Sequence, residues 1–351
     1  MINFIIHYAA YSPRTSPTRE SPIICSGFIT REKYCDKWLG DMFHGDGLGE
    51  CVMATIRERE AKVKSACYEA AAIVEDWRSQ CIGGFRSALD LFELTILPTL
   101  LNNAETWVEM TEEAVNMLEE LQLFFVRLVL RVPKSTPKPA LKSETGLTSM
   151  KLRIWKKKVM MIHHLKNLSD SALAKQVWRE QMQQNWPGLA REVSKICDEL
   201  GIENVNHSQS GRQELKTLVN NACRTRNQSE LKEKMDGMSK MEGLINQDCN
   251  AKPYLESKSL NDVRDTFRLR TRVIDGMAWV IDGIRGNFRN MYPGNKGNCE
   301  GCGKELETQA HVVDCAEFAD FREGLDMSKE SDMVKFFKGV LERRRENESG
   351  E

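Results

Sequence analysis

The sequence predicts a mainly α-helical protein, an irregular helical bundle with a short β-rich edge at its N-terminus and a small Cys3His module near its C-terminus. Three observations predict this class. Apolar residues recur at three- and four-residue steps from about residue 47 onward. Residues that favour β-strands concentrate before residue 31. Three cysteines and one histidine gather between residues 299 and 315.

The composition narrows the class of protein further. A chain of 351 residues is long enough for two domains, or for one domain with appendages, and its formal net charge of −1 excludes a uniformly basic protein. Outside the C-terminal cluster its cysteines are irregularly spaced, which indicates reduced thiols and an intracellular location, the cytoplasm or the nucleus. It has no run of about eighteen apolar residues and no signal sequence, so we expect no membrane partner.

The N-terminal segment, residues 1–46, is the expected β-rich edge. Residues 2–8 and 22–30 are rich in Ile, Phe and Tyr, and a stretch of Ser, Pro and Thr separates them. Two short strands alone do not make a stable sheet. We therefore expect this segment to be the border of something larger and to be partly disordered.

Three helices are expected between residues 47 and 131. The second spans residues 87–102, with Ser87 as its N-cap and a kink at Pro98, which lacks a backbone N–H. The third opens at Thr111, where acidic residues meet the positive end of the helix dipole, and a proline-rich connector follows it. The first has an apolar stripe formed by Val52, Ile56, Val63, Cys67, Ala70, Val74 and Trp77.

A fourth helix, starting near Ser149, carries six Lys or Arg residues and no acid between residues 148 and 166. Its apolar face consists of Leu152, Trp155, Val159, Ile162 and Leu165. The basic face is either the solvated side of a core helix or a surface that contacts phosphates, because uncompensated cations release counterions on nucleic acid. The two interpretations are equally open. The candidate contacts, which would not depend on base sequence, are Lys151, Arg153, Lys156, Lys157 and Lys158.

Residues 169–250 are expected to form a helical linker region, with helices at 171–185, 188–200 and 213–247. Residues 251–296 contain a helix at 259–275 with a second basic cluster, followed by Trp279, Phe288 and Tyr292. Arginines interleaved with aromatic residues are typical of surfaces that bind single-stranded nucleic acid. Aromatic residues packed in a core explain the same pattern, so both interpretations stay open. The arginines of this cluster are Arg264, Arg268, Arg270 and Arg272.

The C-terminal module, residues 297–325, has the spacing Cys-x2-Cys-x8-His-x3-Cys, formed by Cys299, Cys302, His311 and Cys315. A zinc ion takes four tetrahedral sulfur or nitrogen ligands, and this set supplies them. Gly301 and Gly303 allow a tight turn around the first pair. The second pair shares one face of a helix that begins near Thr308. Because protein groups fill all four positions, a structural Zn2+ is favoured over a catalytic one. The alternative is three reduced cysteines and a surface histidine.

The last segment, residues 326–351, is expected to be a helix and a charged tail. The helix spans 331–345 and places Met333, Phe336, Phe337 and Val340 on one side. Residues 299–351 contain fourteen Asp or Glu against eight Lys or Arg. An acidic module is a poor phosphate binder, so we expect the zinc ion to stabilise the fold and the basic helices to carry any nucleic-acid contact.

Motifs for catalysis are missing from the sequence. Metal-dependent phosphoryl transfer needs clustered carboxylates, and no Asp-Asp pair occurs. The sequence also lacks a nucleotide-binding P-loop, a Gly-x-Ser-x-Gly elbow and a His-Glu-x-x-His helix. We therefore expect neither enzyme activity nor a small-molecule substrate.

Several stretches, in order, resemble one family. Lys37-Trp-Leu-Gly-Asp41 resembles the Lys-Tyr-Leu-Gly turn that follows the palm in reverse transcriptases of non-LTR (LINE-type) retrotransposons. Residues 86–107 look like the helix leading into the thumb of these RNA-directed DNA polymerases, and residues 128–158 are similar to the thumb connector and the basic helix after it. Residues 267–272 and the Cys3His set resemble the C-terminal region. The resemblance covers about residues 31–168 and 255–345.

The resemblance implies the C-terminal part of such a polymerase, with a thumb-like helical domain at residues 47–168 and a zinc module. The fingers, the palm and the catalytic aspartates of the family precede the point where this sequence starts, so residues 1–46 would follow a missing palm. The chain also departs from the family. Trp38 replaces the usual Tyr, and the eight residues before His311 exceed the spacing in retroviral knuckles, which argues against direct RNA contacts by the module.

The expected function is therefore that of a non-catalytic fragment with sequence-independent affinity for RNA or an RNA–DNA duplex. A polymerase palm supplied in trans is a further candidate partner. The residues expected to carry the affinity are Lys151, Arg153, Lys156, Lys157, Lys158, Arg268, Arg270 and Arg272. The alternative is a protein-interaction scaffold. In that case the zinc module and the terminal helix dock another protein, and the basic helices are merely solvated.

Overall fold

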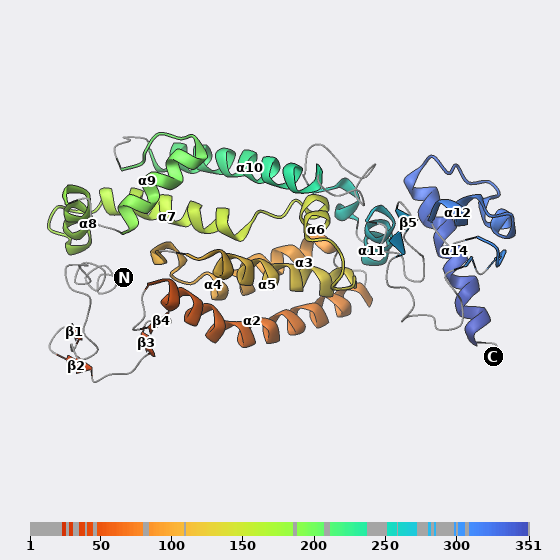
Figure 1. Ribbon diagram of the computed structural model, residues 1–351, viewed down its shortest axis with the longest axis horizontal. Coiled ribbons are helices and arrows are strands. Elements are labelled where there is room, and N and C mark those ends of the chain that lie inside the picture. Colours follow the sequence, from red (N-terminus) through yellow and green to blue (C-terminus); the bar gives the residue numbers. More distant parts are fainter. Residues whose placement is uncertain are drawn as a thin grey trace. The chain divides into compact units, whose positions relative to one another are not determined.

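The protein is mostly helical, as the sequence predicts (Figure 1). The computed structural model describes residues 23–25, 28–30, 35–38, 41–44, 48–79, 84–108, 110–184, 188–206, 211–236, 251–257, 259–271, 280–281, 284–285, 298–299, 301–305 and 309–349. Among these residues, no helix combines the length and the apolar character that crossing a bilayer requires.

The described strands form three separate antiparallel hairpins of two strands each. They pair β1 (Ile23–Cys25) with β2 (Phe28–Thr30), β3 (Cys35–Trp38) with β4 (Asp41–His44), and β5 (Val280–Ile281) with β6 (Ile284–Arg285). Within the described ranges these strands join no larger sheet. The strand expected at residues 2–8 lies outside the described residues, as does most of the expected β-rich edge.

The chain divides into two compact units, and each unit is assembled from three segments of chain. Unit 1 comprises Met1–Glu69, Leu91–Phe125 and Thr148–Glu230, and unit 2 comprises Ala70–Asp90, Val126–Leu147 and Leu231–Glu351. Three of the five boundaries fall inside long helices, which are α2 (Leu48–Ser79), α5 (Glu112–Leu130) and α10 (Arg212–Asp236). The six consecutive segments expected from the sequence do not follow these boundaries.

A continuous helical run covers the second helix that the sequence predicts. It consists of α3 (Phe85–Leu91), a π-helical turn (Phe92–Ile96) and α4 (Leu97–Leu100), followed by a 3-10 turn (Ala104–Thr106). The run begins two residues before Ser87, the expected N-cap. Pro98 lacks an N–H, and its ring would clash with the carbonyl of Leu94 in a regular α-helix. The π turn just before Pro98 widens the backbone there, so a π turn stands where a kink was expected.

Helix α7 (Met150–Lys166) is the expected basic helix, and its start follows the expected chemistry. The Ser149 side chain accepts a hydrogen bond from the N–H of Leu152, so Ser149 is its N-cap. The apolar face of α7 is buried in one core with α8 (Leu173–Gln183), α9 (Leu189–Leu200) and part of α10. Helices α9 and α10 lie along α7 (Figure 1). The region expected as a helical linker thus packs in a core.

In unit 2, the segment before α11 (Leu260–Arg270) packs closely against α6 (Lys138–Thr145). Helix α6 ends at Gly146, whose φ of 67° favours glycine. A Cβ atom at Gly146 would lie 2.4 Å from the backbone nitrogen of Ala251, so no side chain fits there. The backbone N–H of Lys252 donates to the carbonyl of Glu144 (3.1 Å), and a 3-10 turn (Pro253–Glu256) follows.

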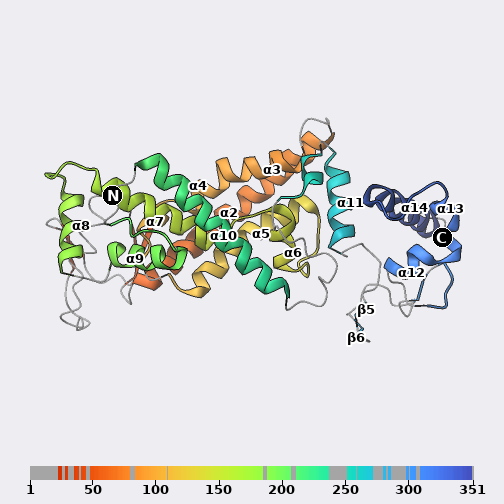
Figure 2. The same cartoon turned by 90° about the horizontal axis from the view of Figure 1, so that it is seen from above.

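The C-terminal module of unit 2 has a core of its own. It contains α12 (Gln309–Asp314), a 3-10 turn (Ala316–Phe318), α13 (Ala319–Arg322) and α14 (Glu330–Ser349), and α13 lies beside α14 (Figure 2). As the sequence predicts, one side of α14 is buried. Its residues Val334, Phe336, Phe337 and Val340 pack with Cys299, Val312, Cys315 and Phe318.

Candidate metal centre and basic clusters

The four predicted metal ligands come together at one point of the C-terminal module. The ligand atoms of Cys299, Cys302, His311 and Cys315 all lie within 4.8 Å of one another. Sγ of Cys299 is 3.8 Å from Sγ of Cys315, and Sγ of Cys302 is 3.4 Å from Nε2 of His311. A tetrahedral ion with bonds of about 2.0–2.3 Å separates its ligands by about 3.4–3.8 Å. The arrangement therefore fits a metal ion.

The backbone around the first cysteine pair forms the tight turn that the glycines predict. The N–H of Gly303 donates to the carbonyl of Cys299 (2.7 Å), and Gly303 has a φ of 67°. Gly301 is required for a different reason, because a Cβ atom there would lie 2.9 Å from Cβ of Glu317. The turn closes when the N–H of Cys299 donates to the carbonyl of Glu305 (2.7 Å).

The second ligand pair is placed by α12, which ends at Asp314, the residue before Cys315. His311 lies within this helix, and the N–H of Cys315 donates to the His311 carbonyl (2.7 Å), so the two ligands share one face. The guanidinium of Arg322 donates to the carbonyls of Val313 and Cys315, the latter at 2.9 Å. These bonds satisfy carbonyls at the end of the helix that would otherwise lack partners.

An acidic residue outside the predicted set orients the histidine. Oε2 of Glu305 lies 3.0 Å from Nδ1 of His311, while Nε2 of the same ring faces Cys302. A carboxylate on the far nitrogen of a ligating histidine fixes the ring orientation and the tautomer. The sequence contains a signal for this role, a carboxylate inside the loop between the two ligand pairs, but loops of this kind often carry acids that do nothing similar.

The two thiols of the first pair have different acidities. Hydrogen bonds from the backbone of Lys304 and Glu305 lower the pKa of Cys302 to about 6, and His311 adds to this effect. Burial raises the pKa of Cys299 to about 11. Metal binding requires thiolates, so Cys302 is the ligand that the protein fold itself prepares for an ion.

The basic residues of α7 are surrounded by acids from other elements. Four of the five candidate contacts form ion pairs, each with a residue at least 34 positions away in the sequence: Lys151–Glu199 (3.8 Å), Arg153–Glu93 (2.8 Å), Lys157–Glu105 (3.0 Å) and Lys158–Glu192 (2.5 Å). Lys151 also lies over the ring of Trp155, 4.4 Å from its centroid. Lys156 is half-buried and has no ion pair within the part of the chain that the structure describes. The helix has no acid of its own, yet its charge is largely balanced.

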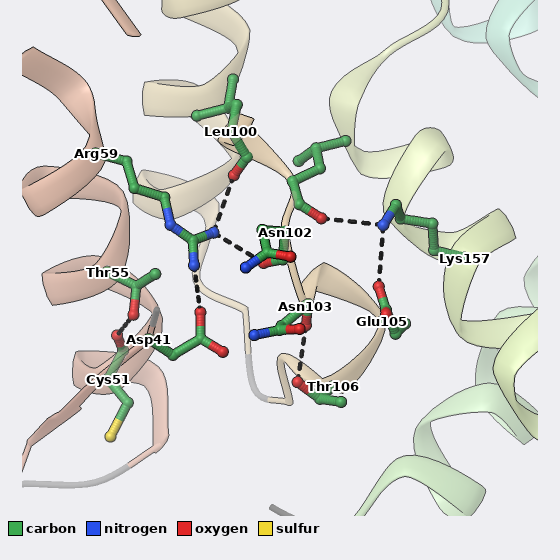
Figure 3. A network of polar contacts seen from close by, with 11 residues as sticks. Asp41, Cys51, Thr55, Arg59, Leu100, Asn102, Asn103, Glu105, Thr106 and Lys157 are labelled. Carbon is green, nitrogen blue, oxygen red and sulfur yellow. Dashed lines mark hydrogen bonds and ion pairs between the residues drawn. The ribbon is translucent and has the colours of Figure 1, made fainter. Parts of the chain in front are cut away.

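Lys158 is the candidate contact least accessible to a ligand. Its side chain is 1% exposed, and burial lowers its pKa although Glu192 opposes the shift. Lys157 is 41% exposed, but its ammonium donates to the carbonyl of Leu101 and to Glu105, both at 3.0 Å (Figure 3). The burial of Lys158 therefore argues against a contact between this residue and nucleic acid, whereas part of the Lys157 side chain stays accessible to a ligand.

Figure 3 also shows how the turn that resembles the family motif is attached to α2. Arg59 on α2 forms a 2.5 Å ion pair with Asp41, the last residue of that turn, and both side chains are buried. The same guanidinium donates to the carbonyls of Leu100 (3.2 Å) and Asn102 (2.8 Å). Arg59 therefore joins three separate stretches of unit 1.

The second basic cluster also has partners within unit 2. Arg270 forms a two-pronged ion pair with Glu144 (2.6 and 3.1 Å), a buried residue of α6 that also accepts from the hydroxyl of Tyr254. Arg268 donates to the carbonyl of Arg131 (2.7 Å). Arg272 lies outside the described residues, as do the aromatic residues Trp279, Phe288 and Tyr292. The described arginines of this cluster thus hold α11 to its neighbours.

The chain was compared with protein-family models, curated proteins and solved structures, and none of them matches it significantly. The Cys3His geometry and the charge clusters are therefore the observations on which a function can be argued.

Proposed function

We propose that the chain is the C-terminal part of a LINE-type reverse transcriptase, comprising a thumb-like helical part and a zinc module, and that it has no polymerase activity of its own. One observation carries this proposal. The four ligand atoms of the Cys3His set, which resembles the C-terminal region of that family, converge within 4.8 Å. The zinc ion would be held by Cys299, Cys302, His311 and Cys315.

The role proposed for the zinc ion is structural. All four ligand positions are protein groups, so no position remains for water or a substrate. Cys299 and Cys315 are also part of the apolar core of the module, in contact with residues of α14. Zinc contributes roughly 10–16 kcal/mol of apparent binding free energy in small finger peptides, which is ample for a core of this size.

Native mass spectrometry of the full chain tests the metal site. We expect one zinc ion per chain, and Cys302→Ser should lose it, whereas Cys51→Ser, which removes a thiol outside the cluster, should keep it. Glu305→Gln should weaken zinc binding by roughly 10–100-fold, the usual cost of losing a carboxylate behind a histidine ligand. A metal-free wild type, or a Cys302→Ser chain that binds zinc normally, would contradict the site.

The polymerase assignment has a separate test. The genomic sequence directly upstream should encode a palm, in frame or interrupted, if the chain is derived from such a polymerase. Primer extension by the purified chain would contradict the proposed lack of activity. Neither outcome depends on the zinc measurement, so the two parts of the proposal can fail independently.

We further propose a residual, sequence-independent affinity for RNA or an RNA–DNA duplex. The half-exposed cations of α7, Lys151, Lys156 and Lys157, support it. Binding carried by phosphate contacts falls steeply as salt rises. Filter binding at two salt concentrations should show this fall, and Lys156→Gln should weaken binding while Lys62→Gln, on the exposed side of α2, should not. Absent binding, or binding equal at both salt concentrations, would remove this part of the proposal.

The alternative is a protein-interaction scaffold, and one observation favours it. The ion pairs of α7 with Glu93, Glu105, Glu192 and Glu199 leave little free positive charge on that helix. In this case the C-terminal module and α14 would dock another protein, such as a polymerase palm in trans. Capture of a partner that survives high salt and nuclease treatment, and that is lost in Cys302→Ser, would favour the scaffold over nucleic-acid binding.

A further inference from the structure

Three arginines of unit 2 converge on a single carboxylate. Glu75 on α2 contacts Arg78 one turn later (Nε to Oε2, 2.7 Å), Arg131 after the end of α5 (Nη2 to Oε2, 3.1 Å), and Arg264 on α11. The three guanidiniums thus come from three segments that are distant in sequence. We call Glu75, Arg78, Arg131 and Arg264 the Glu75 cluster.

The innermost arginine of the Glu75 cluster is not fully hydrogen-bonded. The Arg264 side chain is 3% exposed, its Nη2 donates to Glu75, and its Nε donates to the carbonyl of Val129 (2.8 Å). Its Nη1 is buried and has no hydrogen-bond partner among the described residues. Because Nη1 shares a carbon with Nη2, it lies inside the same cluster. A buried charged donor without an acceptor costs free energy, and an anion at this point would remove that cost.

The outermost arginine is held in place while its side chain stays accessible. Arg131 has a φ of 51°, the left-handed conformation that ends a helix, and its carbonyl accepts a hydrogen bond from Arg268 (2.7 Å). Its side chain is nevertheless 56% exposed. A guanidinium has five N–H donors, so the contact with Glu75 leaves most of those on Arg131 for a second anion.

The cluster carries more positive than negative charge. Three guanidiniums share one carboxylate, and Arg268, the next cation, lies 4.0 Å from Asp265, which also pairs with Lys338. Burial lowers the pKa of Arg264, the hydrogen bond to Glu75 and the charge of Glu75 oppose this effect, and the charges of Arg131 and Arg78 add smaller contributions in the same direction as burial. Among the described residues, the three guanidiniums of the cluster thus share a single carboxylate and keep a net positive charge.

We propose that the Glu75 cluster binds a phosphate-type oxyanion. Arginine is suited to this ligand because its planar fork donates two parallel hydrogen bonds to phosphate oxygens. The anion would accept from Nη1 of Arg264 and from the accessible donors of Arg131 and Arg78. The proposal requires neither the zinc ion nor the polymerase assignment, and it places an anion site in unit 2.

The test compares two variants of the full chain that each remove one positive charge. Arg131→Asn removes a cluster arginine, and asparagine tolerates the left-handed backbone at this position. Arg86→Gln removes an exposed arginine outside the cluster, whose ion pair among the described residues is with the exposed Asp90 (3.3 Å). The thermal midpoint of each chain is measured in sodium phosphate and in sodium chloride of equal ionic strength, and phosphate binding is titrated by calorimetry.

Phosphate should raise the thermal midpoint of the wild type and of Arg86→Gln, and Arg131→Asn should bind phosphate at least about tenfold more weakly, the cost of one charge-assisted contact. Equal effects of phosphate on both variants, or none on the wild type, would overturn the site. A short single-stranded RNA then identifies the source of the phosphate. Sensitivity of RNA binding to Arg131→Asn indicates a phosphodiester chain, and insensitivity indicates a free phosphate group.

Discussion

The cations of α7 and the arginines of the Glu75 cluster meet their counter-charges in different ratios. On α7, four of the five candidate contacts each have a carboxylate of their own. At Glu75, three guanidiniums share one carboxylate. A helix that is conspicuously basic in sequence is thus largely neutralised in three dimensions, whereas an excess of positive charge arises where arginines from three distant segments of the sequence meet. A candidate anion site is therefore indicated by the ratio of cations to nearby acids in the structure, and not by the number of Lys and Arg residues in a stretch of sequence.

The strongest challenge to this comparison is Glu75→Gln, which removes the only carboxylate of the cluster. Arg264 would remain buried beside two other arginines without a counter-charge. We therefore expect the free energy of unfolding to fall by about 3–5 kcal/mol, as when one partner of a buried ion pair is removed. Urea unfolding measures the change. Glu60→Gln, in a partly exposed pair with Lys64 (2.6 Å) on the same helix, is the matched control and should cost less than about 1 kcal/mol.

The same variant has a pH signature. Burial alone would raise the pKa of Glu75, but hydrogen bonds from Arg264 and Arg78 and the charges of Arg264 and Arg131 outweigh burial and lower it. A carboxylate with a lowered pKa stabilises the fold above its ordinary value of 4.5, and this stabilisation is lost as the pH falls through the folded-state pKa. The stability difference between wild type and Glu75→Gln should therefore be constant near neutral pH and shrink below about pH 4.5. A difference that does not change with pH would show that Glu75 acts through packing.

A smaller effect is expected at the one-to-one pair on α7. Lys158→Met keeps the volume of the buried side chain but leaves Glu192 without its cation. Because Glu192 is 23% exposed and lies in the first turn of α9, water and the helix dipole can stabilise its charge. We expect a loss of about 2 kcal/mol in urea unfolding. A loss as large as that of Glu75→Gln would mean that charge ratio does not distinguish the two regions.

The smallest effect is expected for Lys157→Met. This lysine is 41% exposed, so its pair with Glu105 is screened by solvent. The loss of the pair and of the bond to the Leu101 carbonyl should cost at most about 1 kcal/mol in urea unfolding. If nucleic acid uses the half-exposed face of α7, the same variant should weaken RNA binding more than it weakens the fold, and the two measurements together separate the roles.

Local patterns predicted well those features that depend on neighbours in sequence. The start of α7 near Ser149, the buried face of α7 and the buried side of α14 were predicted from the sequence pattern, and the structure confirms them. The convergence of the Cys3His set was likewise readable from spacing, because its members lie within seventeen residues. The identity of the ion remains a prediction.

Features that depend on distant partners could not be predicted in this way. The acid for Lys157 is 52 positions away, and the acid for Arg264 is 189 positions away. A short stretch of sequence contains the cation but not its distant counter-charge. The net positive charge of a basic helix face is therefore overestimated from the sequence. Glu305 lies close to His311 in sequence, but its contact with the histidine ring could not be predicted, because many acids in such loops make no contact of this kind.

The division of α2, α5 and α10 between the two units limits how this protein can be cut. Loss of the chain after residue 230 would remove the last segment of unit 2. The other two segments of unit 2, Ala70–Asp90 and Val126–Leu147, would then lack their packing partners, and their buried apolar side chains include Val74, Phe85 and Val129. Because each unit is built from three segments, a single cleavage cannot release either unit intact, and we expect a truncated chain to expose apolar surface and to aggregate.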